Sequence, residues 1–186
     1  MKLLICSAIF TLLTFVSVAQ EFMGVKVEGD KATFINKFKA KGFVVTLADN
    51  PNAVTMKGTV GGKQYELILF LTPTTKQVWK LSVYLPEATS WLKIKSEYED
   101  YLGILTEKYG APEKAYTFFS SPYYEGDGYE MNAIKLEKCH YSAFWSDSVG
   151  IWIQISQFQQ VKIAYENAKN SALNDLEKKQ INSKIF

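Results

Sequence analysis

The residues with the clearest chemical potential are His140 and Cys139, which are adjacent in the chain. His140 is the only histidine, so a serine or cysteine nucleophile would have to use it as its base. The segment 139–145 alternates as a β-strand does, and neighbours in a strand point to opposite faces. We therefore expect a buried thiol, a partly exposed histidine, and no catalytic role for either residue.

Acidic residues offer two further possibilities. Glu97 and Asp100 lie three positions apart on a predicted helix, where we expect them to share the solvent face. Paired carboxylates can hydrolyse glycosides, but charges opposite an apolar stripe are more often a solvated helix face. The loop 125–130 offers oxygens to Ca²⁺ without the acidic alternation of an EF-hand loop, and capping by Asp127 and Glu130 accounts for it better. We expect no metal, no cofactor and no catalytic residue.

Aromatic residues are the most suggestive feature of the sequence. They gather around one predicted loop and in two adjacent strands, at Phe118, Phe119, Tyr123, Tyr124, Tyr129, Trp145 and Trp152. Exposed rings stack on sugars or anchor a protein partner, whereas buried rings fill the core, which we expect for most of them. The predicted ligand- or partner-binding residues are Tyr123, Tyr124, Tyr129 and Trp152, and the loop position beside Pro122 makes Tyr123 and Tyr124 the rings expected to be exposed.

A helix over 90–109 is the element around which the rest of the chain is arranged. Its apolar residues recur at gaps of three and four, which is typical of an amphipathic helix, and Gly110 with Pro112 ends it. We expect Trp91, Tyr98, Leu102 and Leu105 to face the core.

Short segments of alternating pattern lie on both sides of this helix. Before it we predict a strand or extended lead-in at 22–27, a helix at 30–41 capped by Asp30, and strands at 43–48, 53–60, 64–71 and 78–85. After it we predict strands at 114–119, 139–145, 150–157 and 161–165, a turn at 146–148, and either a helix or a strand within 127–138. In the strand 78–85, the alternation places Trp79, Leu81, Val83 and Leu85 on the core face.

This order predicts an α+β fold made of two consecutive helix-plus-antiparallel-meander units. One domain would cover 20–166, with half-units 22–86 and 88–166, and a polar, partly helical tail would cover 167–186. Each sheet would be covered by its helix on one face and open to water or to a partner on the other.

The first 19 residues have the pattern of a signal peptide. Lys2 is followed by an apolar run, and small residues at 17–19 predict cleavage after Ala19. Cys6 lies too early in the apolar run to be a lipidated cysteine. The expected location is periplasmic or extracellular, with no stable membrane insertion after cleavage. The mature chain would keep Cys139 as its single thiol and would have no internal disulfide.

The charge and residue composition of the chain limit the classes of partner that it can bind. The formal net charge is +2, hydrophobic residues make up 47% of the chain, and every basic residue is lysine. Such a chain can build a core, but it has neither the positive charge nor the arginine forks that nucleic-acid binding uses. We therefore expect no nucleic-acid partner.

The opening FMGVKVEGDKATFINKFKAKGF, together with LTEKYGAP, YSAFW and VKIAYENAKN, resembles a family of secreted Bacteroidetes proteins. That family has no assigned activity, so the resemblance implies an exported α+β protein and no active-site residue. The two-part layout also resembles, at the level of fold alone, the β-lactamase inhibitory proteins.

The sequence as a whole favours an exported, non-enzymatic binding or protein-interaction protein. Its expected partner is another envelope or extracellular protein, or a glycan, held on an open sheet face or by the Tyr123–Tyr124 loop. The alternatives are a carbohydrate-related enzyme that uses surface carboxylates, and an assembly or stability factor for another exported protein.

Overall fold

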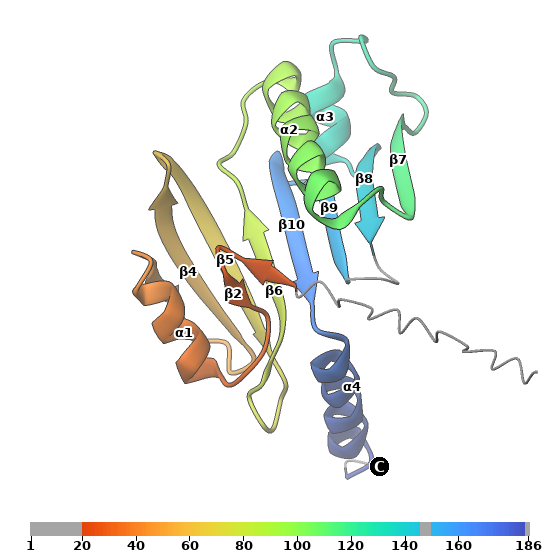
Figure 1. The fold of residues 1–186 in the computed structure, drawn as a ribbon. Helices are drawn as coiled ribbons and strands as arrows, with labels where there is room; N and C mark the ends of the chain where they lie inside the picture. The colour runs from red at the N-terminus through yellow and green to blue at the C-terminus, as the bar shows by residue number, and fades with distance from the viewer. Residues whose placement is uncertain (1–19, 146–149, 185–186) are drawn as a thin grey trace, which may run out of the picture.

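The computed structural model describes residues 20–145 and 150–184. The predicted signal peptide and the turn predicted at 146–148 lie outside these residues. The described chain is a mixed α+β protein, in which a large antiparallel sheet is accompanied by four helices and a small two-stranded hairpin (Figure 1). Among the described residues, no helix has the length and apolar character needed to span a membrane.

The first part of the chain forms a small hairpin, one helix and four strands. Their bounds are β1 Glu21–Phe22, β2 Val25–Lys26, α1 Lys31–Lys39, β3 Val44–Leu47, β4 Ala53–Val60, β5 Lys63–Leu71 and β6 Val78–Tyr84. The Asp30 carboxylate caps α1 by accepting a hydrogen bond from the Thr33 amide. Gly61 and Gly62 both have positive φ, as a two-residue turn between β4 and β5 requires.

The second part adds three helices and four strands. Their bounds are α2 Trp91–Tyr109, β7 Lys114–Phe119, α3 Glu130–Lys135, β8 Cys139–Trp145, β9 Ile151–Ser156, β10 Gln160–Glu166 and α4 Ala168–Asn182. The segment with two predicted alternatives is therefore helical, but α3 begins only at Glu130. Gly126 and Gly128 have positive φ, a conformation outside the right-handed helix, so the helix cannot begin at Asp127.

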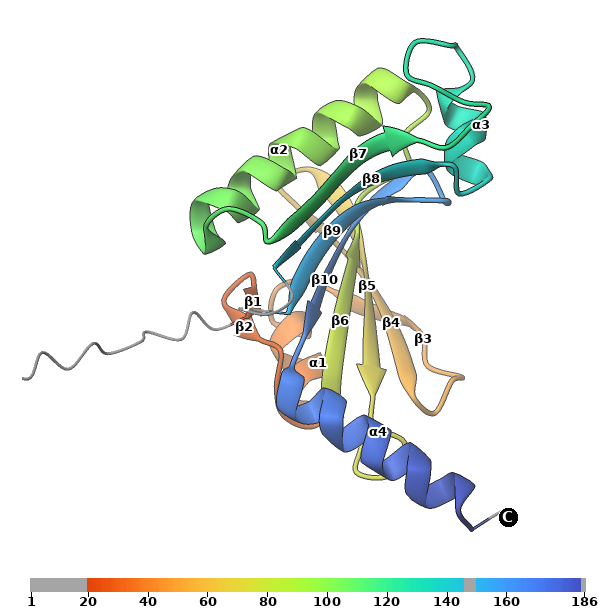
Figure 2. The same ribbon diagram turned by 90° about the vertical axis from the view of Figure 1, so that its right-hand side faces the viewer.

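The strands form one sheet in the order β3-β4-β5-β6-β10-β9-β8-β7. The prediction of separate sheets is wrong, because β6 and β10 pair antiparallel and join the two meanders edge to edge. Figure 2 shows α1 and α2 on one side of this twisted sheet, with α3 beside its upper end and α4 beside its lower end.

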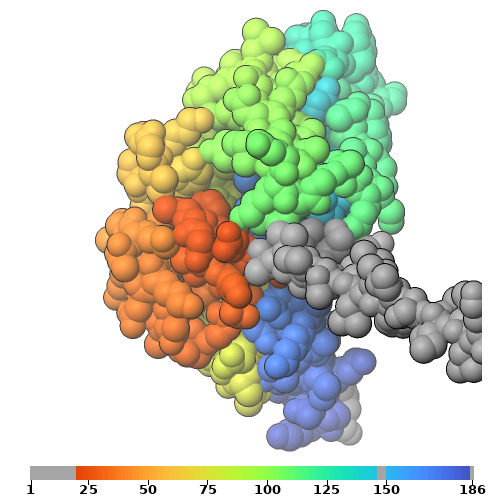
Figure 3. Space-filling view, in the orientation of Figure 1, coloured from red at the N-terminus to blue at the C-terminus, as the bar shows by residue number. Residues whose placement is uncertain are grey.

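The core lies between the sheet and the helices α1 and α2. Phe38 of α1 packs edge-on against Phe43, and Tyr98 of α2 packs edge-on against Tyr141 of β8. Phe22 of the small hairpin stacks on Phe38, and Figure 3 shows this hairpin between the two helices. The helix-covered face of the sheet is thus continuous from β4 to β8.

The prediction that four side chains of α2 face the core is confirmed: Tyr98 and Leu105 are buried, and Trp91 and Leu102 are partly buried and packed against the core. One prediction about α2 needs correction. Glu97 does not share a solvent face with Asp100, because it is buried, with its carboxylate 3.8 Å from the Lys63 ammonium of β5. The stripe that faces the sheet is wider than the apolar residues alone indicate.

The predicted core face of β6 is wrong at its beginning. Val78 is fully buried, whereas Trp79 is only half-buried. Leu71 lies opposite Val78 and Phe70 opposite Lys80, so Trp79 is the extra residue of a β-bulge. The bulge turns the Trp79 ring toward Phe70 and Lys80, away from the core.

The C-terminal helix α4 is held by polar groups. Its buried residues are Asn170, Asn174 and Glu177, and Leu176 is exposed. Asn170 donates to the Val78 carbonyl, and the Glu177 carboxylate accepts from the turn between β5 and β6. The predicted polar, partly helical tail therefore contains a 15-residue helix, which is held at the start of β6 and at the turn before it.

Candidate functional site

The sheet face opposite α1 and α2, here called the open face, carries a continuous band of side chains. Residues that pair directly across strands share a face, and the register gives one row across all eight strands: Val44, Lys57, Glu66, Tyr84, Lys162, Gln154, Ser142 and Tyr116. A second row lies beside it: Thr55, Ile68, Ser82, Ala164, Trp152, Phe144 and Lys114. The open face therefore mixes rings, amides and lysines.

A lysine surrounded by aromatic rings lies near the centre of the open face. The Lys80 ammonium is 4.4 Å from the centroid of Trp152, 5.5 Å from Trp79 and 5.7 Å from Phe70. Lys80 is in β6 and Trp152 is in β9, so the lysine reaches across β10 at Ala164, whose small side chain is fully buried. These distances are typical of cation–π contacts.

A second lysine lies on the neighbouring strand. The Lys162 ammonium of β10 is 5.6 Å from the centroid of Tyr84. Burial lowers the pKa of both lysines, and Glu166 partly opposes this at Lys80, whereas the Lys80 charge lowers the pKa of Lys162 further. Within residues 20–145 and 150–184, neither ammonium forms an ion pair or a hydrogen bond.

Two recesses lie at the α3 end of the open face. The larger, of about 520 Å³, lies between Glu66 and Tyr84 of the sheet and Phe158 of the β9–β10 turn. The smaller, of about 220 Å³, is lined by His140, Ser142 and Gln154. Gln157 lines both, so the recesses are neighbours. Both are lined by a mixture of polar and apolar side chains.

His140 has the position expected from alternation, together with a contact that the sequence did not indicate. It is half-buried on the open face, stacked on Phe118 with ring centroids 4.6 Å apart, and its Nε2 is 2.7 Å from the Ser120 hydroxyl. Within the described residues, the other ring nitrogen of His140 has no hydrogen-bond partner. In residues 20–145 and 150–184, the Ser120–His140 pair therefore has no third group that bonds the imidazole as in a catalytic triad.

Cys139 points to the opposite face of the sheet, and its thiol has low reactivity. It is a free, buried cysteine, and burial raises its pKa to about 12, with the nearby Glu125 charge adding to the effect. A thiol with so high a pKa has almost no thiolate at neutral pH, and the thiolate is the reactive form. The structure therefore separates Cys139 from His140.

The structure does not bring the four predicted binding residues together. Tyr124 and Tyr129 are 65% and 60% exposed in the segment that joins β7 to α3, and Tyr123 is half-buried there. Trp152 lies within the sheet, opposite Ala164. Of these residues, only Trp152 belongs to the open face.

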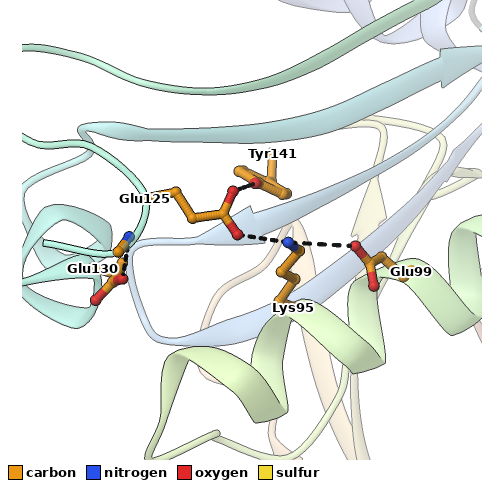
Figure 4. A network of polar contacts seen from close by, with 6 residues as sticks. Lys95, Glu99, Glu125, Glu130 and Tyr141 are labelled. Carbon is orange, nitrogen blue, oxygen red and sulfur yellow. Dashed lines mark hydrogen bonds and ion pairs between the residues drawn. The ribbon is translucent and has the colours of Figure 1, made fainter. Parts of the chain in front are cut away.

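A polar network fixes the segment that carries the three tyrosines. The Glu125 carboxylate accepts from the Lys95 ammonium at 2.6 Å and from the Tyr141 hydroxyl at 2.8 Å, and Glu130 accepts from the Gly126 amide at 2.7 Å (Figure 4). Lys95 also lies 3.9 Å from Glu99. The hydrogen bond from Lys95, and to a smaller extent the one from Tyr141, hold the pKa of Glu125 below its usual value. These carboxylates therefore act as anchors of the loop.

In the described part of the chain, no group of three or more histidine, cysteine or acidic residues is arranged to hold a metal ion. The residues that sequence reasoning missed are Lys80 and Lys162. Lysines at alternating strand positions normally indicate solvent exposure, and only the pairing of β6 with β10 and the bulge at Trp79 place them among rings.

The chain was compared with protein-family models, with curated proteins and with solved structures, and none of them matches it.

Proposed function

We propose that this protein is a non-enzymatic binding protein that holds its partner on the open face of its sheet. The observation that carries the proposal is the band of half-buried rings and lysines on the face that α1 and α2 leave uncovered. Side chains that serve only solubility are usually exposed and mixed, whereas aromatic and cationic anchors that are partly desolvated are typical of binding surfaces.

The dimensions of the open face suit a protein partner. Eight strands at about 4.8 Å spacing give a width of roughly 34 Å, and strands of four to nine residues give a mean height of roughly 20 Å. Their product is of the order of the roughly 800 Å² that each partner contributes to a standard protein interface. The recesses of about 520 and 220 Å³ at the α3 end add relief into which a partner's side chains fit.

The compartment is part of the same proposal. We infer that residues 1–19 are removed as a signal peptide and that the mature protein acts in the periplasm or outside the cell. The Lys2 start, the apolar run and the small residues before Gln20 support this inference. N-terminal sequencing of the exported protein tests it: the inference requires Gln20 at the N-terminus and fails if Lys2 is retained.

We also infer that the chain consists of two helix-plus-meander units, α1 with β3–β6 and α2 with β7–β10. In each unit a helix precedes four strands, and the fourth strands, β6 and β10, are the pair at the centre of the sheet. This layout supports the fold-level likeness to the β-lactamase inhibitory proteins, from which we take no partner.

The test is a capture experiment with matched variants. The mature protein is immobilised and exposed to envelope and culture-medium fractions, and retained proteins are quantified by mass spectrometry. Trp152→Ala with Tyr84→Ala alters the open face, whereas Leu92→Ala with Ile104→Ala removes exposed apolar side chains of α2 as a control.

The proposal requires retention of a partner by the wild type and by the α2 control, and its loss by the open-face variant. Circular dichroism and a thermal unfolding curve establish that both variants are folded. Equal retention by the open-face variant, or the absence of any specifically retained partner, would overturn the proposal.

A further inference from the structure

We propose that the occupant of the open face is an acidic segment of a partner protein, whose carboxylates pair with the ammonium groups of Lys80 and Lys162. The inference rests on the proposed function, because it names the chemistry of the partner that the same face holds. The proposed function assigns binding to the open face as a whole, whereas this inference assigns the choice of partner to two lysines.

The first argument is that these two charges are only partly compensated within the chain. Elsewhere on the open face the Lys57 ammonium is 2.9 Å from the Glu66 carboxylate, so that pair is internally neutral. Lys80 and Lys162 are half-buried, and within the described residues neither forms an ion pair. Glu166 lies opposite Lys80 on β10 and raises the pKa of Lys80, but the opposing effect of burial is larger. A partly desolvated cation whose charge is only partly compensated is unfavourable, and an incoming carboxylate reduces this penalty.

The second argument is the position of the two lysines. They lie on β6 and β10, the central pair of the eight strands, where an interface is most fully desolvated when a partner binds. Lys80 lowers the pKa of Lys162, which places the two charges within reach of each other's field. One acidic segment that crosses these two strands therefore meets both ammonium groups.

The third argument concerns the buried polar group beneath them. Ser82 lies between Lys80 and Tyr84 on β6, is fully buried, and its hydroxyl has no hydrogen-bond partner. On the open face it sits opposite Ala164 and Ile68, so apolar and cationic groups surround it. The Ser82 hydroxyl therefore accepts no hydrogen bond from either ammonium group, so it does not compensate their charges.

The rings favour a polypeptide over a sugar as the carrier of these carboxylates. Sugar recognition by stacking needs a bare aromatic face, but the Lys80 ammonium lies over the Trp152 ring at 4.4 Å, and Lys162 lies over Tyr84. The ring edges remain available to apolar side chains. An acidic segment with interspersed apolar or aromatic residues satisfies both the lysines and the rings.

The experiment measures binding of two polyanions by fluorescence anisotropy. The probes are a labelled glutamate–tyrosine copolymer and labelled alginate, an acidic polysaccharide. The wild type is compared with Lys80→Met plus Lys162→Met, in which the long apolar stems remain. Lys41→Met plus Lys93→Met removes two exposed lysines from other surfaces and has the same net charge.

We expect the copolymer to bind the wild type and the control pair alike and to bind the Lys80–Lys162 pair roughly tenfold or more weakly, the effect of losing charge-assisted contacts. Lys80→Arg plus Lys162→Arg, which keeps both charges, should recover most of the binding. Equal weakening in both methionine pairs would mean a non-specific charge effect and would overturn the inference. Binding of alginate alone would also overturn it, in favour of an acidic glycan.

The same variants separate this inference from the proposed function. If Lys80→Met plus Lys162→Met still retains the partner in the capture experiment, while Trp152→Ala plus Tyr84→Ala does not, the open face is the binding site and the acidic-segment inference is wrong. If neither pair changes retention, the proposed function fails as well. Unfolding curves of all variants exclude loss of fold as the cause.

Discussion

The anchoring of α4 by Glu177 gives the most direct quantitative prediction. The carboxylate accepts hydrogen bonds from the Thr74 amide at 2.6 Å and from the Thr75 hydroxyl at 2.6 Å, with the Thr75 amide at 3.3 Å. Glu177 is buried, but Thr74 and Thr75 are exposed residues. In Glu177→Ala, water can therefore hydrate part of the amide and hydroxyl groups of Thr74 and Thr75 that lose the carboxylate as their acceptor. We therefore expect the low end of the range for charged hydrogen bonds, a loss of about 2 kcal/mol.

This loss should act locally, because the other anchors of α4 are also polar and few. A decrease of about 2 kcal/mol in the free energy of local opening accelerates amide exchange roughly 30-fold. Hydrogen exchange followed by mass spectrometry should show this acceleration in peptides from 168–182. Asp175→Asn, which changes an exposed acid of the same helix, is the control and should leave exchange unchanged.

Acid should reproduce the effect of the substitution. Burial raises the pKa of Glu177, but the hydrogen bonds from Thr75 and Thr74 outweigh it, and the net pKa lies below its usual value of 4.5. The carboxylate is therefore stabilised by folding, and its contribution is complete above 4.5 and lost as the pH falls through the lower value of the folded protein. After correction for the intrinsic exchange rate, which itself falls with pH, the protection of the α4 amides should decrease over this acid range in the wild type and vary much less in Glu177→Gln. Identical α4 exchange in the wild type and Glu177→Ala at neutral pH would refute the reasoning.

Three further outcomes follow from the described contacts. Leu105→Ala should lower the free energy of unfolding by about 2–5 kcal/mol, because this side chain of α2 is buried in the core; a denaturation midpoint equal to that of the wild type would contradict this. Cys139 should resist maleimide labelling at pH 8 until the protein unfolds, given its pKa of about 12, whereas rapid labelling of the folded protein would show an accessible thiolate. His140 lines the smaller recess of the open face, so His140→Ala should weaken partner capture, whereas Tyr123→Ala with Tyr124→Ala, on a segment outside that face, should leave capture and the circular dichroism spectrum unchanged; the reverse result would place the binding site on the tyrosine segment.

Local sequence signals were sufficient to predict the strands. The ends of β3 to β10 differ from the predicted ends by at most one residue, because alternation and the turn residues Gly61 and Gly62 act over a few positions. The sequence also allowed a helix within 127–138 to be predicted, but it did not allow the first residue of that helix to be predicted. The conformations of Gly126 and Gly128 fix that start, and the sequence alone does not indicate them.

Features that depend on distant pairing could not be predicted. The bulge at Trp79 exists only because Leu71 and Phe70 pair as they do, and it reverses the expected direction of that ring. In α4, Asn170 and Glu177 are buried against backbone groups of other segments, so a search for apolar periodicity finds no buried face. The lysines of the open face were missed for the same reason, since their surroundings come from strands on either side.

The pairing of β6 with β10 has a consequence for how the chain reaches its native state. β6 spans residues 78–84 and its partner β10 spans 160–166, so the central ladder closes only after nearly the whole chain is present. Until then β6 is an unprotected edge, and unpaired strand edges promote aggregation. Contacts this distant in sequence give slow folding, on the order of milliseconds to seconds. The docking of β10 should therefore be the late step of folding, and a chain truncated before residue 160 should expose the edge of β6 and aggregate.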